Sequence, residues 1–156
     1  SWWNFYEKLV SKGYAVELSH KCELEDFIYY VQKLIRNKSL DTSEGLTIVP
    51  SALDEDQVIM DWCTDLNSTW ENYTLVGMDI GTDSFVLMVL SNEEFKRAKE
   101  LAKELLHRID VAERLWWIGE SHMSIVRLPE YEAEFEPEVF EIYALPRSDA
   151  NGRVLI

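Results

Sequence analysis

Residues 73–90, YTLVGMDIGTDSFVLMVL, hold the strongest structural signal in this chain of 156 residues. Two apolar runs flank a Gly-Thr-Asp-Ser tetrapeptide that starts at Gly81, which is the pattern of a β-hairpin. The outgoing run from Phe85 to Leu90 is apolar at every position, and this predicts a central strand that is covered on both faces. The 75–90 hairpin is therefore expected to be the centre of a mostly antiparallel sheet.

Four helices are expected around this hairpin, from apolar residues spaced three and four apart. They are a helix that ends at Gly13, one over residues 23–37, one that begins at Asp54 and one that runs from Ser91 to about residue 107. Asp54 and Ser91 each have a Gln or Glu three residues later, which is the capping-box pattern of a helix start. The sequence therefore predicts helices that pack on the sheet.

Shorter strands are expected at several other places along the chain. They cover residues 14–18, 46–49, 123–128, 131–136 and 140–145. Residues 38–45 have the composition of a polar loop, and residues 111–118 fit either a strand or a helical turn. No internal repeat or low-complexity segment is visible. The prediction is one α+β domain over residues 1–156, a mostly antiparallel sheet packed by about four helices.

Charge is the most unusual feature of the composition. The chain has 15 Lys and Arg against 29 Asp and Glu, a formal net charge of −14. Residues 39–95 contain no Lys or Arg but twelve acids, and residues 128–146 contain six glutamates and no base. Such a field repels nucleic acids and anionic lipids and attracts basic proteins. We therefore expect no nucleic-acid or membrane partner; the plain alternative is an acidic surface that keeps the protein soluble.

Cysteine usage and hydropathy indicate a cytoplasmic protein. No uncharged apolar stretch reaches the roughly 18 residues that a membrane span needs, and no secretory signal is visible. The two cysteines, Cys22 and Cys63, are too few for a disulfide framework and fall in predicted helical regions. Reduced, partly buried thiols are favoured over a single disulfide.

The hairpin also carries a resemblance to a known family. Residues 75–87 read LVGMDIGTDSFVL. This motif resembles a bacterial family catalogued as a domain of unknown function, number 6630, whose members carry an Asp-x-Gly-Ser-Asp-Ser-Tyr-like turn before an apolar strand and a helix. Here Thr82 stands where Ser is commoner, and Phe85 where Tyr is commoner. The resemblance covers roughly residues 53–109. It implies a small cytoplasmic bacterial α+β protein and brings no established activity.

Asp79 and Asp83, on either side of the hairpin turn, are the candidate residues for chemistry. Two carboxylates can bind a divalent cation or perform general acid/base work. The structural alternative is turn chemistry, because Asp side chains in Gly-containing turns bond their own backbone. No further metal ligands, nucleophile elbow or phosphate-binding glycine loop are specified by the sequence. We therefore expect no metal, no cofactor and no enzymatic activity.

The leading functional hypothesis is a non-enzymatic acidic binding protein. By analogy with small acidic bacterial proteins, it would be an immunity-type inhibitor that neutralises a basic, nuclease-like toxin. An exposed tryptophan rimmed by carboxylates would suit a basic partner. The candidate partner-binding residues are Asp54, Glu55, Asp56, Asp61, Asp65, Glu71, Trp116, Trp117, Glu130, Glu132, Glu134 and Glu136. The alternatives are a metal-dependent hydrolase or small-ligand enzyme that uses Asp79 and Asp83, and an adaptor domain.

Overall fold

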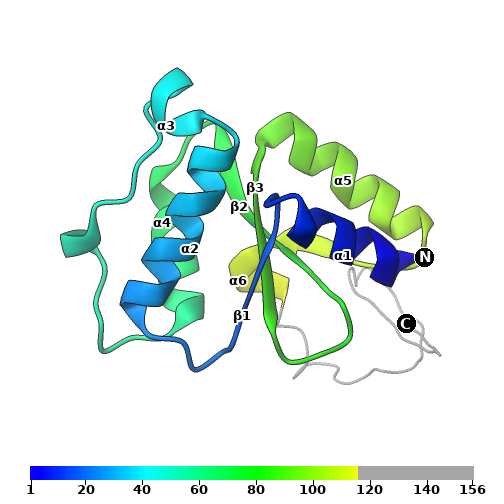
Figure 1. Ribbon diagram of the computed structural model, residues 1–156, viewed down its shortest axis with the longest axis horizontal. Coiled ribbons are helices and arrows are strands. Elements are labelled where there is room, and N and C mark those ends of the chain that lie inside the picture. Colours follow the sequence, from blue (N-terminus) through cyan, green and yellow to red (C-terminus); the bar gives the residue numbers. More distant parts are fainter. Residues whose placement is uncertain (116–156) are drawn as a thin grey trace. The chain divides into compact units, whose positions relative to one another are not determined.

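The computed structural model describes residues 1–115, drawn as ribbon in Figure 1. The elements are α1 (Trp2–Ser11), β1 (Val16–Leu18), α2 (Leu24–Asn37), α3 (Leu40–Ser43), the 3₁₀ turn η1 (Pro50–Ala52), α4 (Ile59–Thr69), β2 (Tyr73–Met78), β3 (Phe85–Ser91), α5 (Asn92–Glu104), β4 (Ile109–Val111) and α6 (Ala112–Leu115). The chain divides into two compact units. The first holds Ser1–Phe95 and Val111–Glu113, and the second holds Lys96–Asp110 and continues from Arg114. We describe each unit by itself.

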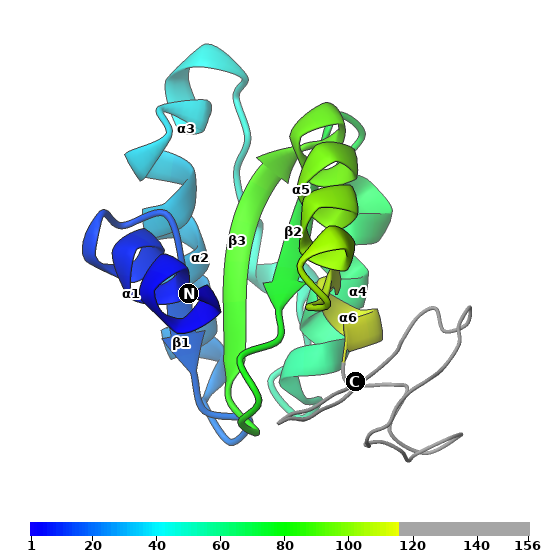
Figure 2. The same cartoon turned by 90° about the vertical axis from the view of Figure 1, so that its right-hand side faces the viewer.

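The β2–β3 hairpin is the centre of the first unit, as predicted. The two strands pair antiparallel, with Leu75 opposite Val89, and β1 pairs antiparallel with the other edge of β3. The turn between them bends at Gly81, whose φ of +83° favours glycine. Figure 2 shows β2 and β3 side by side above this turn. The order of the strands in the sheet is β1-β3-β2-β4. The last residue of β4, Val111, belongs to the first unit. The α+β class with an antiparallel sheet is confirmed.

Strand β3 is covered on both faces, because every residue from Phe85 to Val89 is buried. Residues directly opposite each other in an antiparallel pair point to the same face. The Tyr6 hydroxyl of α1 donates to the carboxylate of Glu17, which pairs with Val86, so α1 lies on the Val86 face. Helix α2 packs on β1 and β3, and α4 packs on β2, on the opposite face of the sheet (Figure 1). The Phe27 ring of α2 lies 5.4 Å from the Trp62 ring of α4, centroid to centroid.

Three of the predicted boundaries are wrong, each for a local reason. Residues 46–49 form no strand, because the Leu46 N–H donates to the Leu40 carbonyl to close α3 and only Ile48 enters the core. Helix α3 lies within residues 38–45, which the sequence predicted to be a polar loop. Helix α5 ends at Glu104, because Leu106, two residues later, adopts a left-handed φ of +63° that does not continue the helix. The third wrong boundary is the start of α4.

Helix α4 begins at Ile59 instead of next to Asp54. The carboxylate of Asp54 accepts the N–H of Asp56 at 2.9 Å, which makes a tight turn where the helix was expected. The helix is capped instead by Asp61, whose Oδ2 accepts the N–H of Val58 at 3.2 Å. By contrast, the predicted capping box of α5 is complete: the Glu94 N–H donates to Ser91 Oγ, and the Ser91 N–H donates to Glu94 Oε1.

Both cysteines are free thiols, as expected. Cys63 is buried in α4, and burial raises its pKa well above the usual value. Cys22 is half-buried just before α2, and burial, followed by the nearby Asp26 carboxylate, raises its pKa too. A raised thiol pKa leaves little thiolate at neutral pH. Within residues 1–115, no helix is long and apolar enough to span a bilayer.

Candidate functional site

The candidate site is a set of carboxylates along α4 and its two flanking segments, which we name the acidic surface. Its members are Asp54, Glu55, Asp56, Asp61, Asp65 and Glu71. All are exposed apart from the half-buried Asp65. The first three lie in the loop before α4, the next two on the helix, and the last just after it.

Helix α4 holds this surface in place through its inner side. Ile59, Trp62, Cys63 and Leu66 are buried. The Trp62 Nε1–H donates to the backbone carbonyl of Asp54 at 2.7 Å, so a core side chain fixes the acidic loop that precedes the helix. Asp61 comes just before this tryptophan and is exposed on the outer side of α4, whereas Asp65 lies three residues after it and is half-buried at the edge of the buried side.

The far end of α4 is fixed by the side-chain amide of Asn67. Its Oδ1 accepts the N–H of Leu75 at 2.7 Å, and its Nδ2 donates to the Leu75 carbonyl at 3.0 Å. The same Nδ2 donates to Glu113 Oε1 at 2.8 Å. Beyond the helix, the Glu71 carbonyl accepts Asn92 Nδ2 at 2.7 Å. The acidic surface therefore lies on a scaffold that is hydrogen-bonded at both ends.

The acidic surface has no cation of its own within residues 1–115. The ion pairs found there join Lys38 to Glu94 and both Lys99 and Arg108 to Asp110. Asp61 and Asp65 are like charges four residues apart on one helix, an arrangement that destabilises a helix by about 0.2–0.5 kcal/mol. The last turn of α4 carries no basic residue to offset this cost. Asp54 and Asp61 each accept one backbone N–H, but none of these bonds neutralises a charge, so the negative charge of the acidic surface can still attract a positive group from outside.

The Lys38 ammonium forms an ion pair with the carboxylate of Glu94 in the first unit. Its Nζ lies 2.8 Å from Glu94 Oε1 and donates to the Val89 carbonyl at 3.1 Å. This hydrogen bond is the main cause that lowers the pKa of Glu94, and bonds from Ser91 add to it. The pair joins the end of α2 to the capping box of α5, so its role is structural.

The hairpin turn shows the predicted turn chemistry. Asp79 Oδ1 accepts the N–H of Gly81 at 2.8 Å, and the Asp79 carbonyl accepts Trp2 Nε1–H at 2.7 Å. Asp83 is exposed at the other side of the turn. Among residues 1–115, no group of three or more His, Cys, Asp or Glu side chains is placed to hold a metal ion. The carboxylate of Asp79 thus stabilises the turn in which it lies.

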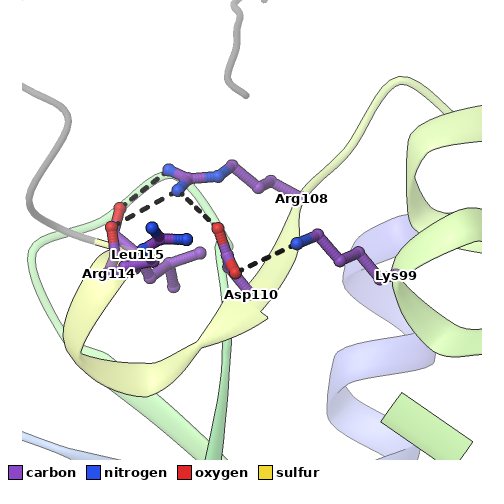
Figure 3. Close-up of polar contacts among 5 residues, drawn as sticks. All are labelled: Lys99, Arg108, Asp110, Arg114 and Leu115. Carbon is purple, nitrogen blue, oxygen red and sulfur yellow. Dashed lines mark hydrogen bonds and ion pairs between the residues drawn. The ribbon is translucent and has the colours of Figure 1, made fainter. Parts of the chain in front are cut away.

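Among the described residues of the second unit, 96–110 and 114–115, one carboxylate is buried, that of Asp110, which is 7% exposed. Its Oδ2 accepts Arg108 Nη2 at 3.0 Å, and its Oδ1 lies 3.4 Å from Lys99 Nζ (Figure 3). Arg108 also donates to the carbonyls of Leu115 and Arg114, at 2.9 and 3.3 Å. The carboxylate orients a guanidinium that binds the last carbonyls of α6, which is a structural use of the charge.

The other predicted partner-binding residues lie outside the described part of the chain. They are Trp116, Trp117, Glu130, Glu132, Glu134 and Glu136. The strands expected over residues 123–145 lie outside it as well. Of the predicted site residues, the structure therefore places only the acidic surface and the two aspartates of the hairpin turn.

Comparison with known proteins gives one result. A family model described as "Domain of unknown function (DUF6630)" matches residues 1–112. No curated protein and no solved structure matches the chain. The match is wider than the resemblance over residues 53–109, since it begins at α1 and takes in the whole acidic surface. The chain belongs to the DUF6630 family.

Proposed function

We propose that this protein is a non-enzymatic binding protein of the bacterial cytoplasm, whose acidic surface takes a basic protein as its partner. The best specific candidate is an immunity-type inhibitor of a basic, nuclease-like toxin. Such an inhibitor presents carboxylates where the toxin expects phosphates.

One observation supports this proposal most: the exposed Asp61 and the half-buried Asp65 of α4 form no ion pair with a cation among residues 1–115, and they lie in a segment of 57 residues, 39–95, without Lys or Arg. The pair costs the isolated helix a few tenths of a kcal/mol. A basic partner would offset this repulsion between the two carboxylates, because its cations attract both of them. Anchoring by Trp62 and Asn67 also holds the backbone that carries these carboxylates, which favours a specific partner over a diffuse counter-ion cloud.

The test is capture of partners from a lysate of the source organism by the full chain, at low salt and again at high salt. A basic protein should be retained at low salt and released at high salt. The variant Asp61→Asn/Asp65→Asn should lose it. The matched control Asp41→Asn/Glu44→Gln removes the same charge from α3 and its end, outside the acidic surface, and should keep it.

Kinetics and activity then separate an inhibitor from an adaptor. Electrostatic steering predicts that the association rate with the purified partner falls steeply as salt rises. A nuclease activity of the partner should disappear when the complex forms. A partner retained equally by both double variants, or an association rate that does not depend on salt, would refute the role of the acidic surface.

A further inference from the structure

Helix α2 carries a pair of exposed aromatic side chains, Tyr29 and Tyr30. Phe27 and Val31 point into the core, and Tyr29, two residues after Phe27, lies on the opposite side and is 54% exposed. Tyr30 is also exposed, and its ring meets that of Tyr29 edge-on with centroids 5.0 Å apart. The pair is an aromatic surface in contact with solvent.

Each of these tyrosines has a carboxylate one helical turn before it. Glu25 precedes Tyr29 by four residues, and Asp26 precedes Tyr30 by four, so each acid and ring are neighbours on the helix surface. All four side chains are exposed. Lys33 lies one turn after Tyr29, and it marks the end of this acidic and aromatic half of α2.

The acidic half of α2 lies beside the acidic surface of α4. The Phe27–Trp62 ring contact joins the first halves of the two helices, and both cover the same face of the sheet (Figure 1). Asp61 and Tyr29 each lie on the outer side of their helix. Because the two helices lie on the same face of the sheet and meet through these rings, one extended basic segment can reach side chains of both.

We propose that Tyr29 and Tyr30 bind arginine side chains of the basic partner, with Glu25 and Asp26 as the acceptors of their N–H groups. A guanidinium stacks on an aromatic ring and donates to a carboxylate at the same time, whereas a lysine ammonium does this poorly. The occupant is thus an arginine-rich protein segment. This inference rests on the proposed function and adds to it the side chain that is recognised.

The probe is a pair of peptides, deca-arginine and deca-lysine, titrated into the full chain at low salt and followed by calorimetry. Carboxylates alone also favour arginine, so the tyrosine contribution is the part that Tyr29→Ala removes. We expect the ratio of the two affinities to fall about threefold in Tyr29→Ala. Tyr29→Phe, which keeps the ring, should preserve the ratio, and so should Tyr14→Ala, which removes an exposed tyrosine outside α2.

The outcomes separate this inference from the proposed function. An unchanged ratio in Tyr29→Ala, with binding weakened by Asp61→Asn/Asp65→Asn, overturns the arginine inference and leaves the acidic surface in place. Equal weakening of both peptides by Tyr29→Ala also overturns it, because the ring would then serve both cations alike. Absence of binding by either peptide at low salt overturns both proposals.

Discussion

Asn67→Ala tests whether one side-chain amide holds α4 to the sheet. The amide satisfies both backbone groups of Leu75, a residue that is fully buried, and also binds Glu113. Without it, one N–H and one carbonyl remain buried without this partner, at about 1–3 kcal/mol each. The higher helix propensity of alanine offsets roughly 0.5 kcal/mol of this loss of stability. The expected loss in the free energy of unfolding is therefore about 1.5–5.5 kcal/mol.

The assay is urea unfolding followed by circular dichroism, with Thr64→Ala as the matched control. Thr64 is exposed on the same helix, and its hydroxyl bonds only the Met60 carbonyl within that helix, so its removal should change stability by less than about 0.5 kcal/mol. A loss below about 1 kcal/mol in Asn67→Ala, with an unchanged slope against urea, would refute the reasoning.

The loss of stability in the variant Asn67→Asp should depend on pH. The new carboxylate still accepts the Leu75 N–H, but it has no donor for the Leu75 carbonyl and lies next to the Glu113 carboxylate. Like charge and burial raise the pKa of an acid in the folded state, so the destabilisation is complete above that folded value. It is relieved as pH falls toward the unfolded value of about 3.9. A deficit that stays constant between neutral and acidic pH would contradict this.

Three further outcomes follow from local geometry. Leu106→Gly should stabilise the protein by about 0.5–1 kcal/mol, because Leu106 is 81% exposed and holds a left-handed φ of +63°; a matching gain in Leu106→Ala would contradict the strain argument. The bond to Lys38 lowers the pKa of Glu94, so its stabilisation is present above the usual value of 4.5 and lost as pH falls through the folded value. Glu94→Gln should accordingly cost less than about 1 kcal/mol near pH 7, in urea unfolding, and progressively less as pH falls below 4.5. Trp62→Phe should cost about 1–3 kcal/mol in the same assay, since it removes the indole donor to the Asp54 carbonyl, which keeps the Gln57 N–H, and leaves a smaller ring in a buried site.

The features that the sequence predicted well depend on neighbours along the chain. The 75–90 hairpin and the capping box of Ser91 and Glu94 are formed by residues only a few positions apart, so their spacing specifies them. The same kind of signal failed at Asp54, because a carboxylate that can cap a helix can also close a two-residue turn.

The features that the sequence did not predict depend on contacts across the fold. Nothing in the spacing of Asn67 and Leu75 specifies that an amide will serve a strand, or that Glu113 will join them 46 residues later. The exposure of Tyr29 is different, because a helix of 3.6 residues per turn places it opposite Phe27, so periodicity alone could have found it.

The bond from the Trp62 indole to the Asp54 carbonyl has a consequence for how a partner would be held. A loop that must be ordered during binding subtracts the entropy of ordering from the affinity. Here the core has already set the shape of the loop from Asp54 to Asp56 before any partner arrives. The loop is therefore preorganised, and a partner with a matching row of cations would meet a rigid template and dissociate slowly.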